Sequence, residues 1–346
     1  IDTNRRRYGF FPFLLFLMAG VTGAFLTGDI FNLYVWFEVL LISSFGLLVL
    51  GGERQQIDGA TKYGLLNLVG TTLFLIATGY LYAIFGTLNM ADIAAKVAGS
   101  GADLPLMTLA TLFFAAFAMK AAAFPVNFWL PAAYHTPSIS VAALFAGLLT
   151  KVGVYAMLRV LVMLMPGEGE ALRPLIGLVA IVTMIAGGLG AIGTSDLRRI
   201  LGYWVIAGIG VMLAGLAIGG AEALGGAIFY MLHSMLVMTA LYCLAGLVGH
   251  VSASFATDRL GGIHAHMPLL SALALLLLLA VSGLPPLSGF WPKALLVRAA
   301  LAGGHAWIAA AILLSGFLIT FAAGRVYLLA FWRPADTDAP PSAKLA

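Results

Sequence analysis

Cysteine and charged residues are the side chains that this sequence has least of. A single cysteine, Cys243, occurs in 346 residues, which excludes an internal disulfide and a thiolate metal cluster, iron–sulfur clusters included. Asp, Glu, Lys and Arg make up only 9% of the chain, so the net charge of +4 cannot form the dense basic surface that binds nucleic acid. Phosphate-binding glycine loops, Ser-His-Asp arrangements and metal-binding motifs are also missing from the sequence. We therefore expect no nucleic-acid partner, no cofactor and no bound metal.

Hydrophobic residues make up 62% of the chain, and its mean hydropathy is +1.04. A helix needs about 20 apolar residues to cross a hydrocarbon core that is ~30 Å thick. Apolar runs of that length fall at about 9–27, 30–50, 63–85, 105–124, 138–164, 174–193, 200–219, 223–247, 268–301 and 305–331. The pattern predicts an all-α polytopic membrane protein with ten helices in a lipid bilayer.

The few basic residues indicate an orientation for these helices. If the three arginines at 5–7 are cytoplasmic, alternation of the ten helices leaves Lys96 and Arg173 in outer loops. The basic residues that then fall on the cytoplasmic side are Arg54, Lys62, Arg198, Arg199, Arg259 and Arg333. This asymmetry follows the positive-inside rule. Because the chain opens with Ile1 and a polar segment instead of a signal peptide, we expect it to be an internal fragment of a longer protein.

Two lysines, Lys120 and Lys151, stand inside otherwise apolar runs, about 15 and 13 residues from where those runs begin. At ~1.5 Å rise per residue, both lie roughly 20 Å deep, too far from either surface to reach water easily. Between them, Pro125 cannot donate a hydrogen bond to the carbonyl of Ala121. A broken helix with a free carbonyl beside a buried amine is an arrangement that handles ions in membrane proteins.

The ten helices divide into two sets of five with a weak internal symmetry. In each set the fourth helix carries prolines and a lysine: Lys120 with Pro125 in the first, and Lys293 within GLPPLSGFWPK in the second. Because five is an odd number of crossings, the second set is expected to be inverted in the membrane relative to the first, as in many transporters. We predict repeats at residues 1–164 and 165–333, followed by a polar tail at 334–346.

Three further ionisable residues lie in or beside the apolar runs. Glu38 is about nine residues into its helix, and a carboxylate there is unfavourable by about 2.5 kcal/mol or more, which favours a function over packing. His233 lies mid-helix in FYMLHSML, and we place His135 at the inner end of the fifth helix, in AYHTPS. Histidine titrates nearest neutral pH, so either residue can pass protons between lysines. Packing, or a static buried ion pair, is the alternative for each of these groups.

Several segments resemble one known family. They are TGDIFNLYVWFE with the GGERQQIDGATKY that follows, the block from Lys120 through WLPAAYHTPS to Lys151, TSDLRRILGYWVIAGIG, and SGLPPLSGFWPK. Together they resemble the D subunits of Mrp-type multisubunit sodium/proton antiporters. More broadly, they resemble the antiporter-like proton-pumping subunits of respiratory NADH:quinone oxidoreductase. The resemblance covers essentially the whole chain and implies that leading helices, and a last helix after the polar tail, are missing.

The resemblance implies roles for individual residues. Glu38 matches the family's essential glutamate, Lys120 its partner lysine and Lys151 its central lysine. Lys293 matches the lysine of the second broken helix, where some relatives carry glutamate, so lysine here disfavours those redox-pump subunits without excluding the others.

The function implied is that of a proton-translocating subunit of a cation/proton antiporter complex in a bacterial inner membrane, a secondary transporter and not an enzyme. Its path would run Glu38–Lys120–Lys151–His233–Lys293, with His135 as a further relay. Protons suit these groups better than sodium, which prefers carboxylate and carbonyl oxygens and is expected to cross elsewhere in the complex. The alternatives are a subunit of a redox-driven pump with the same proton path, and a scaffold whose lysines lock the helix bundle.

We predict that the chain does not transport alone, because its long apolar helices leave faces that need partner subunits. The measurement is sodium/proton exchange by the purified chain in liposomes. Robust exchange by this chain without partners would contradict the prediction.

Overall fold

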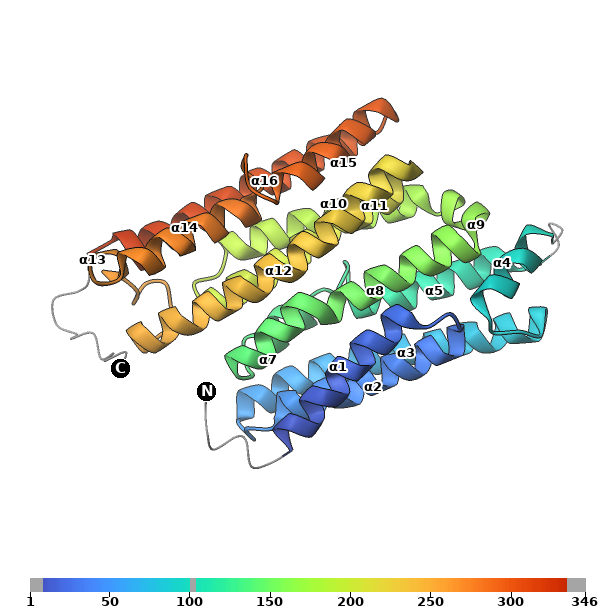
Figure 1. Ribbon diagram of the computed structural model, residues 1–346, viewed down its shortest axis with the longest axis horizontal. Coiled ribbons are helices and arrows are strands. Elements are labelled where there is room, and N and C mark those ends of the chain that lie inside the picture. Colours follow the sequence, from blue (N-terminus) through green and yellow to red (C-terminus); the bar gives the residue numbers. More distant parts are fainter. Residues whose placement is uncertain (1–8, 100–103, 335–346) are drawn as a thin grey trace. The chain divides into compact units, whose positions relative to one another are not determined.

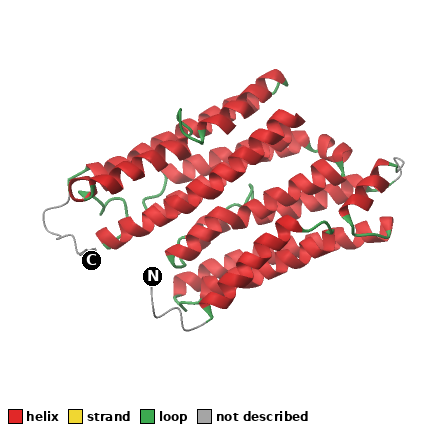
Figure 2. Ribbon diagram, in the orientation of Figure 1, coloured by secondary structure: helices red, strands yellow, loops and turns green. Residues whose placement is uncertain are grey.

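The computed structural model describes residues 9–99 and 104–334, and helices form nearly all of the secondary structure there (Figure 2). Within these residues, β structure is limited to two isolated bridges, Asp29 with Asn89 and Asp196 with Ala256. The arginines at 5–7, which set the predicted orientation, and nearly all of the tail at 334–346 lie outside the described residues. The prediction of an all-α fold is confirmed.

The chain forms two compact units, which we call unit 1 (residues 1–137 and 148–179) and unit 2 (residues 138–147 and 180–346). Unit 1 contains α1 (Phe10–Leu26), α2 (Ile30–Val49), α3 (Arg54–Phe85), α4 (Met90–Ala98), α5 (Leu106–Ala121), α6 (Trp129–Tyr134), α8 (Thr150–Met157), η3 (Leu158–Leu164) and α9 (Pro166–Ala171) (Figure 1). Unit 2 contains α7 (Ile139–Leu144), α11 (Leu197–Ile218), α12 (Gly220–Ser252), α13 (Ile263–His266), α14 (Pro268–Ser282), α15 (Phe290–Ala302), α16 (Ala306–Tyr327) and η4 (Leu328–Trp332). The π-helix η2 (Phe145–Leu149) and α10 (Arg173–Ile192) each pass from one unit to the other.

Each of the ten predicted apolar runs coincides with a helix, with a helix interrupted by π-helical turns, or with two half-helices. Among the described residues, seven helical segments are long and apolar enough to cross a membrane, and α1, α5 and α14 are shorter apolar helices. Helix breaks separate α5 from α6, at the end of the run at 105–124, and α14 from α15, inside the run at 268–301. Pro125 lies in the first break and Pro286 in the second, where each lacks the N–H that a continuing helix needs.

The second long helix of each unit begins in the same way. Asp29 caps α2 by accepting a hydrogen bond from the backbone N of Asn32 at 2.8 Å. Asp196 caps α11 by accepting from the backbone N of Arg198 and of Arg199. Each aspartate also belongs to one of the two β-bridges, so the start of this helix is tied to the loop after the next long helix. The same local structure therefore occurs once in each unit.

An arginine ties the fifth long helix of each unit to the end of the first. In unit 1, Nη2 of Arg159 donates to the carbonyl of Thr27, the C-cap of α1, at 3.1 Å. In unit 2, Nη1 of Arg325 donates to the carbonyl of Ile192, the last residue of α10. A cation at a helix C-terminus satisfies unpaired carbonyl groups and interacts favourably with the helix dipole.

Glycines allow helices to pack backbone to backbone inside unit 1. A Cβ at Gly153 of α8 would lie 2.9 Å from the backbone N of Ala121 and 3.0 Å from the carbonyl of Phe117, both in α5. One at Gly59 of α3 would lie 2.7 Å from the carbonyl of Ala132 in α6. These close approaches fix α5 and its broken continuation against α8 and α3.

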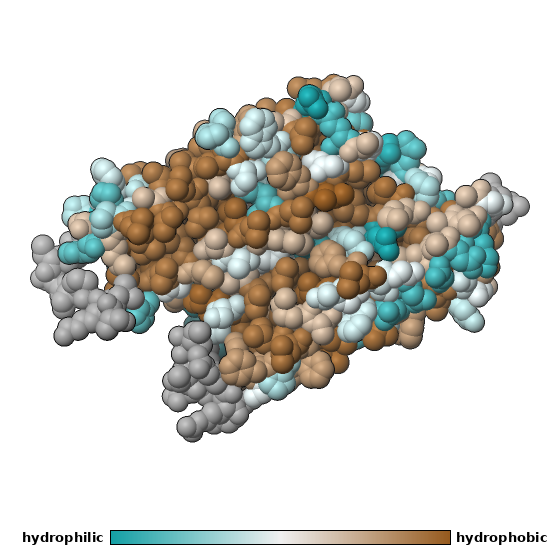
Figure 3. All heavy atoms as spheres, viewed as in Figure 1, coloured by the Kyte–Doolittle hydropathy of each residue, from teal (hydrophilic) through white to brown (hydrophobic). Residues whose placement is uncertain are grey.

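Large apolar side chains cover much of the surface in view (Figure 3). Leu236 is 75% exposed, Leu15 69% and Phe317 67%, and each lies on an apolar helix. A protein that functions in water rarely exposes so much apolar surface. These faces therefore fit contact with lipid or with partner subunits.

We predict that Gly153→Val destabilises the protein by about 1–3 kcal/mol, because the new side chain would push α8 away from the α5 backbone. Gly79→Val is the matched control, since a Cβ at Gly79 of α3 would meet no atom within 4 Å. Thermal unfolding of the two variants in the same detergent tests the prediction, and equal stabilities would contradict it.

Candidate functional site

Lys120 lies at the end of a half-helix, as the penultimate residue of α5. Its side chain is 3% exposed, and its Nζ has no hydrogen-bond partner among the described residues. The ammonium lies 5.7 Å from the ring centre of Phe37 and 5.9 Å from that of Tyr63. Aromatic faces attract a cation, but they are weak substitutes for the oxygen acceptors that a buried ammonium needs. The protonated form of Lys120 therefore depends on whatever charge lies near it.

The nearby charge is that of Glu38, the residue after Phe37 on α2. Glu38 is half-buried, and its carboxylate acts electrostatically on Lys120. The hydroxyl of Tyr63 shares a hydrogen bond with Ser44, also on α2, which fixes the Tyr63 ring beside the ammonium. The structure thus brings together Glu38 and Lys120, which lie far apart in the sequence.

Lys151 is buried on α8, directly after the π-helix η2. Extra residues inserted into a helix as π-turns occur frequently at functional sites. Two residues after Lys151, Gly153 packs against the backbone of Ala121, the neighbour of Lys120. The helices α5 and α8 therefore cross at a point close to both Lys120 and Lys151.

The sequence predicts His135 at the inner end of the fifth helix, and this placement is wrong. His135 is the C-cap of α6, the second half of the broken fourth helix. Its buried ring donates from Nδ1 to the carbonyl of Pro131 at 2.8 Å. The error arises because α6 contains a proline and so resembles part of the break, although proline is tolerated in the first turn of a helix.

In unit 2, Lys293 follows its helix break, whereas Lys120 precedes the break in unit 1. The Lys293 side chain is 8% exposed and turns back across the break. Its Nζ donates at 2.8 Å to the carbonyl of Ser282, the last residue of α14. The ammonium therefore satisfies a carbonyl that has no partner within its own helix.

His233 of α12 faces the same break. It is 4% exposed, and its Nδ1 lies 2.9 Å from Oγ of Ser288. A Cβ at Gly289 would lie 3.0 Å from Nε2 of His233 and would collide with the carbonyl oxygen of Ala280. Lys293 and His233 therefore both lie beside the break between α14 and α15. The predicted step from Lys151 to His233 joins residues of different units and remains a prediction.

Sequence reasoning missed the uncharged groups around these residues. Tyr63, Ser44 and Ser288 orient the ionisable side chains, and the indole of Trp129 donates to the carbonyl of Met119 at 3.2 Å. The signal available was a buried polar residue in an apolar run, but serine, tyrosine and tryptophan occur in such runs for packing alone. Three-dimensional contacts were needed to separate the two cases.

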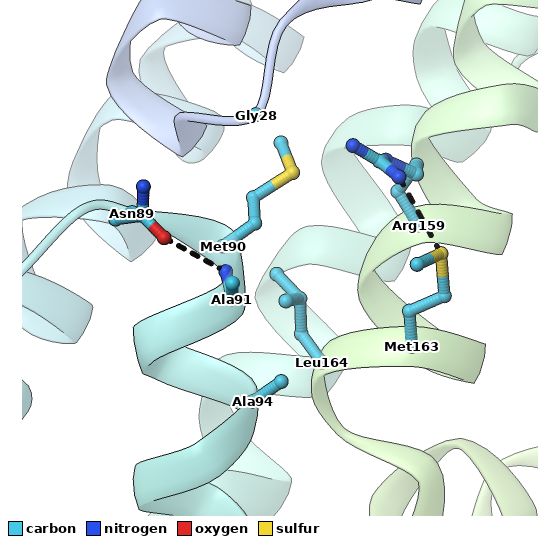
Figure 4. A pocket seen from close by; sticks show the side chains of 8 residues that line it. All are labelled: Gly28, Asn89, Met90, Ala91, Ala94, Arg159, Met163 and Leu164. Atoms are coloured by element: carbon cyan, nitrogen blue, oxygen red, sulfur yellow. Dashed lines mark hydrogen bonds between the residues drawn. The ribbon is translucent and has the colours of Figure 1, made fainter.

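A pocket of 260 Å³ lies in unit 1, away from Glu38, Lys120 and Lys151 (Figure 4). Its lining residues are Gly28, Asn89, Met90, Ala91, Ala94, Arg159, Met163 and Leu164. Besides its bond to Thr27, the Arg159 guanidinium donates from Nη1 to the sulfur of Met163 at 3.6 Å. The charged group in this pocket thus serves as the cap of α1 described above.

The apolar helices, with ionisable groups buried at their breaks, define a polytopic helical membrane protein. The family model for the transmembrane region of NADH:quinone oxidoreductase and Mrp antiporter proteins matches residues 27–320. The chain belongs to this family.

Two relatives carry the name of the D subunit of an Na⁺/H⁺ antiporter. The one from Alkalihalophilus pseudofirmus is 41% identical over 332 residues, which cover 96% of this chain and 67% of the relative. The one from Bacillus subtilis is 37% identical over 346 residues, which cover 100% of this chain and 70% of the relative.

Solved structures are similar as well. A chain of the Mrp complex from Dietzia sp. DQ12-45-1b superposes with a TM-score of 0.88 at 32% identity, over 95% of this chain and 62% of that one. A chain of respiratory complex I from Thermus thermophilus gives 0.88 at 27% identity, over 97% of this chain and 71% of that one. This chain thus spans about two thirds of the length of these proteins.

We predict that Lys293→Ala impairs ion exchange at least tenfold while the complex still assembles, because a buried ammonium beside a helix break is lost. Arg298→Ala on the same helix is the matched control. Its side chain is 71% exposed and pairs with Glu222 at the surface, where such pairs contribute little. Antiport is compared in membrane vesicles at equal complex abundance, and unchanged exchange in Lys293→Ala would mean that this lysine is structural.

Proposed function

We propose that this chain is a proton-translocating membrane subunit of a multisubunit Na⁺/H⁺ antiporter in a bacterial inner membrane. The observation that carries the proposal is the buried ammonium of Lys120, which has the charge of Glu38 nearby and no hydrogen-bond acceptor among the described residues. The named relatives support the antiporter, and the exposed apolar faces support partner subunits.

Glu38 and Lys120 act as a switch in this proposal. While Glu38 is ionised, it stabilises the protonated form of Lys120. When Glu38 takes up a proton, the ammonium is left buried among aromatic rings, and a buried charge without compensation is unfavourable by several kcal/mol. Lys120 then gives its proton to the next acceptor, for which we propose Lys151 on the crossing helix α8.

Beyond Lys151, we propose that protons continue to His233 and Lys293, with His135 as a further relay near the first break. The hydrogen bond between His233 and Ser288 supports this path, because it places an imidazole beside the break that Lys293 spans. Amines and imidazoles bind protons and are poor ligands for sodium. Sodium is therefore proposed to cross elsewhere in the complex or at an interface with a partner subunit.

The two units are proposed to derive from inverted five-helix repeats, residues 1–164 and 165–333. Three features recur in both units and support this. An aspartate caps the second helix and takes part in a β-bridge, an arginine of the fifth helix bonds to a carbonyl at the end of the first helix, and the fourth helix is broken. In many transporters such repeats place their sites near the middle of the membrane.

A subunit of a redox-driven proton pump is the second candidate. The likeness to complex I favours it, as does a chain of the archaeal membrane-bound sulfane sulfur reductase, with a TM-score of 0.87 at 26% identity. The proton path would be the same, and the energy source would differ. The identities of 37–41% to antiporter subunits favour the first candidate.

We predict that Glu38→Gln and Lys120→Ala each abolish exchange while the complex still assembles, and that the double variant is little worse than either single. Glu38→Gln keeps the shape of the side chain and fixes the neutral state, so the switch is lost. Residues that act as one unit give non-additive effects. Antiport is measured in membrane vesicles at matched abundance for the singles and the double. Near wild-type exchange in either single, or additive partial losses, would show that the pair is not the switch.

A further inference from the structure

One face of α3 runs along α5 next to Lys120. Tyr63, Asn67 and Gly70 are spaced i, i+4 and i+7, which places them on the same side of the helix. At one end of this stripe the ring centre of Tyr63 lies 5.9 Å from Nζ of Lys120. At the other end, a Cβ at Gly70 would lie 3.3 Å from the carbonyl of Ala116 and 3.4 Å from Cβ of Met119. Asn67 lies between these two contacts, so it faces the last turns of α5.

Asn67 is buried, at 1% exposure, and only the nitrogen of its side-chain amide makes a hydrogen bond within the described residues. Its Nδ2 donates to the carbonyl of Tyr63 at 2.8 Å, which fixes the orientation of the amide along its own helix. Its Oδ1 has no hydrogen-bond partner among the described residues. A buried amide oxygen without a donor is unfavourable, so such groups nearly always have a partner in the functioning protein.

The facing helix carries the complementary group. Nζ of Lys120 is a buried donor whose partner is likewise missing among the described residues. One unused acceptor and one unused donor thus lie on packed helices at the same level. Glu38 acts electrostatically on Lys120 from α2, and Asn67 lies on α3, so the two groups approach the ammonium from different helices.

We propose that Asn67 is a positioning residue for Lys120: its Oδ1 accepts a hydrogen bond from the ammonium, directly or through one water molecule, when Glu38 is protonated. The inference rests on the proposed proton-translocating function. Asn67 then holds the ammonium during the interval between the neutralisation of Glu38 and the transfer of the proton. An amide keeps no proton of its own, so it stabilises the charged lysine without competing for the cargo.

Other titratable groups must be separated from this effect. Three lie on the elements around Lys120 and are part of the proposed site or touch it: Glu38 on α2, Tyr63 on α3 and Lys151 on α8. The same helices also carry Tyr34, Arg54, Asp58, Lys62, Tyr80, Tyr82 and Tyr155. Farther along, η3 and α9 carry Arg159, Glu168 and Glu170, about two helical turns or more from Lys151. Asn67→Leu changes none of these groups and adds no titratable group, so a shift in its pH profile reports on the acceptor itself.

The test is the pH dependence of antiport in membrane vesicles that contain the assembled complex. Asn67→Leu removes the acceptor at similar volume and disfavours the charged form of Lys120. In the curve of antiport activity against pH, the half-maximal pH of the transition set by Lys120 therefore moves down by about one unit. Asn67→Asp adds a negative charge, which favours the ammonium, so the same transition moves up. Opposite shifts in the two variants are the expected result.

Thr78→Val is the matched control. Thr78 is buried on the same helix, and its hydroxyl donates to the carbonyl of Phe74, so its loss removes a hydroxyl that already has a partner. We expect a wild-type profile. The position of a profile does not depend on the amount of complex, so reduced assembly of Asn67→Leu leaves the comparison valid.

Lys120→Ala separates this inference from the proposed function. If Lys120→Ala abolishes exchange and both Asn67 variants keep the wild-type profile, Asn67 has no positioning role and the function stands. If Lys120→Ala exchanges normally, the proposed site itself is wrong, and the inference fails with it.

Discussion

A helix that ends inside a membrane leaves carbonyl groups without partners, in surroundings where an unpaired polar group is unfavourable by several kcal/mol. The interior of this protein is organised by that constraint. At the end of α5, the indole of Trp129 donates to the carbonyl of Met119 from beyond the break. At the end of α14, the ammonium of Lys293 does the same for Ser282. In both units, a side chain of the half-helix after the break donates to a carbonyl at the end of the half-helix before it, and in unit 1 that carbonyl also accepts from the backbone N of Ala122.

The donor differs between the two breaks: it is a neutral indole in unit 1 and a charged ammonium in unit 2. Lys120 and Lys293 therefore differ in their bonding. At the end of α5, the carbonyls of Ala118 and Met119 accept from the backbone N–H groups of Ala123 and Ala122, and Met119 also accepts from the Trp129 indole, so Lys120 makes no capping bond within the described residues. Lys293 combines a structural bond with its charge. In the proposed path, the proton of Lys293 can leave while the carbonyl of Ser282 keeps a donor, because a neutral amine still provides one.

Much of this arrangement follows from the sequence. The helix positions follow from the apolar runs, and the breaks from Pro125 and Pro286, since proline has no N–H to continue a helix. The ionisable residues are conspicuous because so few charges occur in the chain. In contrast, the partners of those residues depend on which helices touch. Nothing local distinguishes Asn67 or Ser288 from other polar residues in apolar runs, and the π-turns before Lys151 leave no periodic signal in a sequence that is apolar on every side.

The arginines that join the fifth long helix to the first bind main-chain oxygen atoms. The identity of the side chains along α1 and α10 is therefore irrelevant to this bond, whereas the number of residues is not. Adding or deleting one residue would turn the terminal carbonyl by about 100° around the helix axis and away from the guanidinium. This bond therefore constrains the length of the first helix of each unit rather than the identity of its side chains.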